Sequence, residues 1–286
     1  MRIDAHQHFW SYQPIRDSWI TDGMSALKRD FFPQHLLPEL RSAGIDGTIA
    51  VQADQSEEET RFLLRLAEKH HSILGVVGWV DLRAPGIADR LDHFRQFRAL
   101  SGFRHIAQAE PDDRFLLRAD FRRGIALLAE LDFTYDILIY PRQLPAAIEL
   151  VAAHPRQTFV VDHLAKPEIR AGKLQPWARL IRELAAAPNV VCKLSGLLTE
   201  ADWAGWNPKD FNPYLDVVFE SFGAERLMFG SDWPVCLLAG TYRQVVDLIS
   251  TYVRSRPPEE GAAIFGGNAA RFYKLRALSD EPGPRQ

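Results

Sequence analysis

Residues 1–10 read MRIDAHQHFW, a stretch that places a carboxylate and two imidazoles at alternate positions, Asp4, His6 and His8. In an extended strand alternate side chains point to one face, so the spacing predicts that these three groups converge. Ile3 and Ala5 are then expected to form an outward apolar face. Converging imidazoles are suited to metal ligation or to oxyanion chemistry, whereas histidines on a polar terminus only face water. The rest of the chain decides between these alternatives.

Short apolar, β-branched runs alternate with segments of helical period along the whole chain. The runs lie at residues 1–9, 44–53, 72–82, 101–107, 133–140, 157–165, 189–196 and 226–234. Between them, apolar residues recur at helical spacing, as in 33–43. Strands alternating with helices predict a parallel sheet, and about eight such units are typical of a (β/α)8 TIM barrel of the α/β class. A doubly wound sheet is the alternative, but no glycine-rich phosphate loop follows any run.

Composition indicates an ordinary globular protein. The chain has 286 residues, 47% hydrophobic and 25% charged, with a formal net charge of -3. This balance gives no basis for a nucleic-acid or membrane partner, and we expect a cytoplasmic protein without a signal peptide. Two cysteines, Cys192 and Cys236, are too few for a disulfide framework. We expect one barrel domain over residues 1–278 and a Pro/Gly-rich flexible tail at 279–286.

Polar residues close nearly every apolar run. Because barrel active sites lie at the carboxyl ends of the strands, this recurrence predicts an enzyme. The residues are His6, His8, Gln52, Asp54, Trp79, Asp81, Arg104, His105, Asp136, Tyr140, Asp162, His163, Lys193, Ser195 and Asp232.

His6, His8, His163 and Asp232 are expected to face the same barrel mouth. Three imidazoles and a carboxylate can hold one divalent metal and leave a position for water. Alternatively, the histidines hydrogen-bond a developing oxyanion while Asp232 takes a proton from water. Both arrangements hydrolyse a carbonyl compound. Strand alternation predicts that Asp162 points away from His163 and anchors a neighbouring helix or loop.

Further cations and aromatic groups are expected near this mouth. Arg104 and Lys193 could meet a substrate oxygen, although Arg104 could equally pair with a strand-end carboxylate. The aromatic loops 10–32 and 197–211 are expected either to wall a small-ligand site or to seal the barrel mouth or a subunit contact.

Six motifs, taken in order, resemble the amidohydrolase superfamily, and within it the amidohydrolase-2-related group of sugar lactonases and pyrone-dicarboxylate lactonases. The motifs are DAHQH at 4–8, GFRH at 102–105, DHLAKP at 162–167, KLSG at 193–196, FGSDWP at 229–234 and FGGNA at 265–269. The resemblance spans essentially the whole chain. It implies a barrel that opens a sugar (aldono-) lactone such as L-fuconolactone, with a small-molecule sugar lactone as partner.

The resemblance also implies roles for individual residues. Asp232 acts as the general base for water, and His6, His8 and His163 stabilise the oxyanion, directly or through one divalent metal such as zinc held by these four residues. Substrate-positioning groups are Arg104, His105, Trp79 and Lys193.

Two departures argue against a two-metal centre. The fourth run offers Arg104 and His105 where binuclear members use a metal-bridging lysine or glutamate, and the run at 133–141 contains no histidine. The site is therefore expected to hold one metal or none.

Other possible functions are a pyrone-dicarboxylate lactonase, a zinc-dependent decarboxylase on the same fold, and a non-catalytic barrel that binds sugar acids. The sequence leaves the oligomeric state open.

Overall fold

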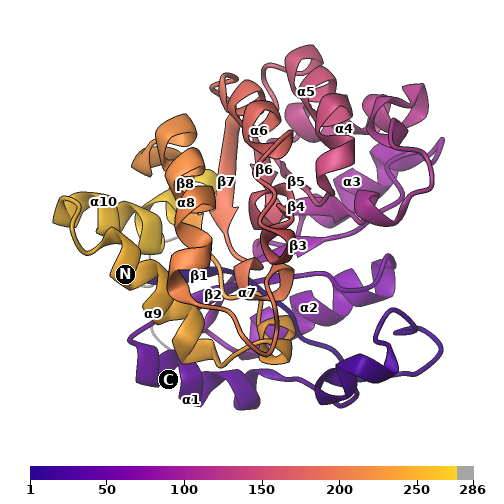
Figure 1. Cartoon of the computed structure of the whole chain (residues 1–286). Helices are drawn as coiled ribbons and strands as arrows, with labels where there is room; N and C mark the ends of the chain where they lie inside the picture. The colour runs from indigo at the N-terminus through magenta and orange to yellow at the C-terminus, as the bar shows by residue number, and fades with distance from the viewer. Residues whose placement is uncertain (276–286) are drawn as a thin grey trace.

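Eight parallel strands form a barrel, and helices surround it (Figure 1). The computed structural model describes residues 1–275. Each strand pairs in parallel with the next one along the chain. The strands are β1 (Ile3–Gln7), β2 (Gly47–Val51), β3 (Ile73–Gly78), β4 (Leu100–His105), β5 (Thr134–Ile137), β6 (Phe159–Val161), β7 (Val190–Leu194) and β8 (Leu227–Phe229). The predicted (β/α)8 barrel is confirmed.

The helices follow the strands in the expected alternation, and the segment predicted at 33–43 forms α1. The α-helices are α1 (Pro33–Ala43), α2 (Glu57–Lys69), α3 (Ile87–Arg95), α4 (Ala119–Glu130), α5 (Leu144–Ala153), α6 (Trp177–Ala185), α7 (Leu197–Glu200), α8 (Pro208–Phe222), α9 (Tyr242–Val253), α10 (Pro258–Ala262) and α11 (Asn268–Phe272). None of the helices in residues 1–275 is long and apolar enough to cross a membrane.

The barrel closes where β1 meets the segment after β8. Gln7 and Trp233 form a parallel bridge. The amide of His8 donates to the Trp233 carbonyl at 2.7 Å, and the amide of Asp232 donates to the His6 carbonyl at 2.8 Å. Backbone hydrogen bonds thus join the two segments that carry His6, His8 and Asp232.

An extra residue in β1 changes which side chains face the barrel interior. Asp4 and Gln7 oppose Thr48 and Ala50, so β1 spans this interval with one residue more than β2. Such a β-bulge reverses the alternation of side chains beyond it.

The bulge corrects two predictions about β1. Ile3 and Ala5 do not face outward; they belong to an apolar cluster inside the barrel. Asp4 does not share a face with the histidines. Its carboxylate points toward the surrounding helices, where it accepts a hydrogen bond from Tyr242 at the start of α9. Beyond the bulge His6 and His8 contact residues at the mouth, as predicted.

The lower part of the barrel is filled with apolar side chains and closed by the C-terminal helix. The cluster consists of Ile3, Ala5, Ile49, Val51, Val77, Val160, Val191, Met228, Ala269 and Tyr273. Ala269 lies in α11 and Tyr273 directly follows it. The barrel is therefore a packed core, and the polar groups concentrate at its opposite end. The predicted domain boundary at 278 and the predicted tail at 279–286 lie outside the described residues.

Candidate active site

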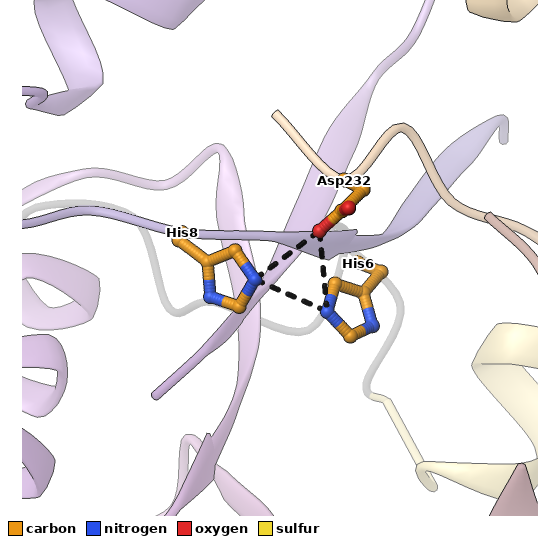
Figure 2. Close-up of side chains that lie close together, drawn as sticks. All are labelled: His6, His8 and Asp232. Carbon is orange, nitrogen blue, oxygen red and sulfur yellow. Dashed lines mark hydrogen bonds and ion pairs between the residues drawn. The ribbon is translucent and has the colours of Figure 1, made fainter. Parts of the chain in front are cut away.

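Asp232 stands beside all three predicted histidines. Its Oδ1 lies 3.4 Å from Nε2 of His8 and 3.8 Å from Nε2 of both His6 and His163. The Nε2 atoms of His6 and His8 are 3.2 Å apart (Figure 2). All four residues are at least 95% buried. The structure therefore brings together the four residues that the sequence assigned to one site.

Left-handed backbone conformations place two of these side chains. Asp232 has φ 56°, and His163 has φ 54° at the start of a run of positive-φ residues that ends at Lys166. Such a conformation is unfavourable for a residue with a Cβ atom, and it is commonly retained at functional sites. Gly196 lies against this turn, because a Cβ atom added there would stand 2.6 Å from the His163 ring.

Asp4 supports the site from outside the barrel. Its carboxylate accepts hydrogen bonds from the Ser231 amide at 2.8 Å, the Ser231 hydroxyl at 2.5 Å, the His6 amide at 3.2 Å and the Tyr242 hydroxyl at 3.1 Å. Burial raises the pKa of Asp4 to about 6, despite the opposing effect of these donors. Asp4 thus connects His6 to the residue that precedes Asp232.

The three histidines turn Nε2 toward Asp232. Nδ1 of His8 lies 2.7 Å from the Val51 carbonyl, which can only accept, so Nδ1 carries the hydrogen. Nδ1 of His163 lies 2.8 Å from the Ser195 hydroxyl. Burial lowers the pKa of His163 to about 4 and that of His6 well below its usual value.

The histidines around Asp232 favour its ionised form. Burial alone would raise its pKa, but attraction to His163 and the other histidines, together with a hydrogen bond to His8, lowers it below the usual range of an aspartate. At neutral pH the carboxylate of Asp232 is therefore ionised while His6 and His163 are uncharged, which is the state in which these groups ligate metals or accept protons.

A buried ion-pair network forms the floor of the site. Asp162 Oδ2 lies 2.9 Å from Nη1 of Arg104, and its Oδ1 lies 3.0 Å from Nζ of Lys193 and 3.2 Å from Nδ1 of His6. Burial opposes ionisation of Asp162, but Lys193 and the neighbouring groups lower its pKa well below the usual range.

The position of Asp162 corrects the prediction that it anchors a helix or loop away from the site. The alternation of side chains holds only in extended backbone, and β6 ends at Val161. Because His163 is left-handed, both Asp162 and His163 contact His6 at the barrel mouth.

Arg104 and Lys193 belong to this floor. The Nη2 of Arg104 donates to the Gln52 carbonyl, and Nη1 lies 3.2 Å from Nε2 of His6. Lys193 is fully buried, with Nζ 2.6 Å from Asp136 Oδ2. Arg104 therefore pairs with a carboxylate at the end of a strand, Asp162, which is the alternative role considered for it. Direct contact between Lys193 and substrate has no support in this geometry.

The network extends to the C-terminal end of the described chain. The hydroxyl of Tyr273 donates to Asp136 Oδ2 at 2.6 Å. Burial raises the pKa of Asp136 to about 6, while Lys193 opposes that shift. Tyr273, which helps to fill the end of the barrel opposite the mouth, therefore hydrogen-bonds to Asp136, the carboxylate that also pairs with Lys193.

Trp79 and His105 form one wall. The indole Nε1 of Trp79 donates to Nδ1 of His105 at 3.3 Å, and Nε2 of His105 lies 2.7 Å from Glu110 Oε1. The imidazole stacks on Phe115 with ring centroids 4.6 Å apart. Both ring nitrogens of His105 are therefore engaged, which makes it a support for Trp79.

The aromatic loops are mostly used for packing. Trp10 and Phe31 are buried, and their ring centroids lie 5.3 Å apart. Phe31 also packs edge-on against Trp233 at 5.2 Å, next to Asp232. Trp203 is 37% exposed. The loop at 10–32 thus seals and braces the barrel mouth, one of the two roles weighed for it.

The donor set fits a single divalent metal. At a zinc-to-ligand distance of about 2.0 Å, tetrahedral ligands lie about 3.3 Å from one another. The separations of 3.2 Å between His6 and His8 and 3.4 Å between His8 and Asp232 match this value closely. The ligand atoms of His6, His8 and Asp232 all lie within 4.8 Å of one another. His163 is not part of this group; its Nε2 lies 3.8 Å from Asp232 Oδ1, and it forms a second group of possible ligands with His6 and Asp162.

Comparison with known proteins identifies the class. The amidohydrolase family model matches residues 3–275, so the chain belongs to the amidohydrolase family. An L-fucono-1,5-lactonase from Burkholderia multivorans is 45% identical, and the alignment covers 98% of each chain. An L-fucono-1,5-lactonase from Burkholderia ambifaria is 39% identical, with 96% of each chain covered. A crystal structure of an amidohydrolase from Burkholderia multivorans with bound zinc is 46% identical, has a TM-score of 0.93, and covers 96% of this chain and 100% of that chain.

Lys193 provides a test of the ion-pair floor. Lys193→Met keeps a side chain of similar length but leaves Asp136 and Asp162 buried without the ammonium group. We expect the free energy of unfolding, measured by urea denaturation, to fall by about 3–5 kcal/mol. Lys69→Met, at an exposed position of α2, is the matched control and should be neutral. A loss below about 1 kcal/mol, as for a surface ion pair, would contradict a structural role of the network.

Proposed function

We propose that this protein hydrolyses an aldonolactone, such as L-fucono-1,5-lactone, to the sugar acid. The observation that carries this proposal is the convergence of three Nε2 atoms on Asp232 Oδ1 at the carboxyl ends of the strands. Relatives that are 39% and 45% identical across nearly the full chain are L-fucono-1,5-lactonases. The reaction is the opening of a cyclic ester by water.

Asp232 is the group that moves the proton. Its contacts with the histidines all involve Oδ1, so Oδ2 is available to a water molecule. As water attacks the lactone carbonyl carbon, its proton passes to Asp232. The tetrahedral intermediate then collapses, the bond from the carbonyl carbon to the ring oxygen breaks, and Asp232 returns the proton to that oxygen.

His6, His8, His163 and Asp232 are the residues that would hold a divalent cation, and we assign zinc to this position. A relative 46% identical over nearly the whole chain has been crystallised with zinc. When bound, such a cation polarises a carbonyl oxygen and lowers the pKa of water. The lowered pKa values of His6, His163 and Asp232 favour the protonation states that metal binding requires.

The rival substrates fit the site less well. A pyrone dicarboxylate carries two negative charges, but Arg104 and Lys193 are already paired with Asp162 and Asp136. A decarboxylase on the same fold would need a cationic position for its carboxylate substrate as well. A barrel that only binds sugar acids has no need of a carboxylate held against three imidazoles. Lactone hydrolysis accounts for all four residues.

Asp232→Asn tests the general-base role. The amide cannot accept the proton of water, so we expect kcat for L-fucono-1,5-lactone to fall by about a thousandfold or more. Circular dichroism should show an unchanged fold. Asp89→Asn, at an exposed position of α3, should retain full activity. An Asp232→Asn protein with near wild-type turnover would refute this role.

Chelation tests the metal assignment. The purified protein should contain about one divalent cation per chain, and its removal should lower both activity and thermal stability, because a ligand that binds only the folded state stabilises it. Adding zinc back should restore both. Full activity in protein shown by elemental analysis to be metal-free would contradict the metal assignment.

A further inference from the structure

Lys166 and Glu200 form an ion pair at the barrel mouth that sequence reasoning did not assign to the site. Lys166 ends the left-handed turn that begins at His163, and Glu200 ends α7, which follows β7. Nζ of Lys166 lies 3.5 Å from Glu200 Oε1 and 5.5 Å from the ring centroid of Tyr140, which follows β5. Segments after β5, β6 and β7 therefore meet at this pair.

The pair is electrostatically coupled to the proposed catalytic groups. Besides burial, the charge of Lys166 contributes to the lowered pKa of His163. Burial raises the pKa of Glu200, and the charge of Asp232 adds to that shift. Geometry places the pair beside His163: the Lys166 amide donates to the His163 carbonyl at 2.7 Å, and the hydroxyl of Thr199, which precedes Glu200, donates to the carbonyl of Gly196, which lies against the His163 ring.

The pair retains unused hydrogen-bonding capacity. A separation of 3.5 Å is long for a charge-assisted hydrogen bond. Among the described residues, no shorter hydrogen bond is made by the Lys166 ammonium or by the Glu200 carboxylate. Their side chains are 17% and 22% exposed, so both are shielded from bulk water but within reach of a ligand. The buried pairs of the floor, which are 0–3% exposed, differ in this respect.

We propose that Lys166 and Glu200 recognise adjacent hydroxyl groups of the substrate ring and thereby select a neutral polyhydroxylated lactone. This inference rests on the proposed lactone hydrolysis. An ammonium group only donates and a carboxylate only accepts, whereas a hydroxyl group does both. One ring hydroxyl accepts from Lys166 while its neighbour donates to Glu200.

The same pair disfavours anionic lactones. The pair carries no net charge, so the attraction of a ring carboxylate or sulfonate to Lys166 is offset by Glu200, and the negative charge of Asp232 adds to the repulsion. Like charges repel more strongly in a shielded site than in bulk water. A lactone without hydroxyl groups avoids repulsion but leaves both charged groups of the pair without their substrate contacts, which lowers its binding.

The test uses Lys166→Met, Glu200→Gln and the double variant, assayed on L-fucono-1,5-lactone and on δ-valerolactone, which has the six-membered ring without hydroxyl groups. Each single variant should lower kcat/KM for the sugar lactone by about tenfold to a hundredfold, mainly through KM. The double variant should be little worse than the poorer single variant, because Lys166 and Glu200 contact each other and each single variant already removes the pairing. Rates with δ-valerolactone should be unchanged.

Lys173→Met and Glu168→Gln are the matched controls, because this pair has the same 3.5 Å separation but is 61% and 54% exposed. They should behave as wild type on the sugar lactone. Equal losses on both lactones, or a fall confined to kcat, would overturn the recognition role, as would unchanged KM for the sugar lactone. If the wild-type protein opens no lactone, the proposed function itself fails, which is a separate outcome.

Discussion

The pairing of Asp162 with Arg104 and Lys193 is the interaction on which the site depends. These charges are buried beneath His6, and each would be strongly unfavourable alone. Together they hold Nδ1 of His6 against Asp162 and leave its Nε2 directed at Asp232. Because Lys193 also bonds Asp136, and Asp136 bonds Tyr273, the orientation of His6 is tied to the closure of the barrel from below.

A second constraint is the direct joining of the first and last strands. The hydrogen bond from the Asp232 amide to the His6 carbonyl fixes the two residues relative to each other. Asp4 reinforces this connection by accepting from both Ser231 and the His6 amide. The left-handed conformations of His163 and Asp232 are tolerated because these surrounding contacts determine them. The result is a cluster of ligand atoms that is preorganised for a metal.

Much of this could be predicted from the sequence. The alternation of apolar runs and helical periods was sufficient for the barrel, since each pattern reflects burial on a strand or a helix. His6, His8, His163 and Asp232 could be assigned to one site because the carboxyl ends of parallel strands meet at one mouth. Strand order alone places these residues at one end of the barrel.

What could not be predicted depends on departures from ideal geometry. The bulge in β1 turned Asp4 outward and Ile3 inward, and no residue type in the sequence marks its position. The left-handed turn after β6 brought Asp162 to the floor of the site, against the alternation rule. The pairing of Lys166 with Glu200 joins loops far apart in the chain, so only tertiary structure reveals it.

The central claim is that water attacks the lactone carbonyl carbon beside Asp232. Hydrolysis of L-fucono-1,5-lactone in water enriched in oxygen-18, followed by mass spectrometry of product fragments, tests it most directly. The account predicts one heavy oxygen in the carboxylate of the sugar acid and none in the hydroxyl group released from the ring. Label in that hydroxyl group would mean that water attacked the ring carbon and would contradict the account.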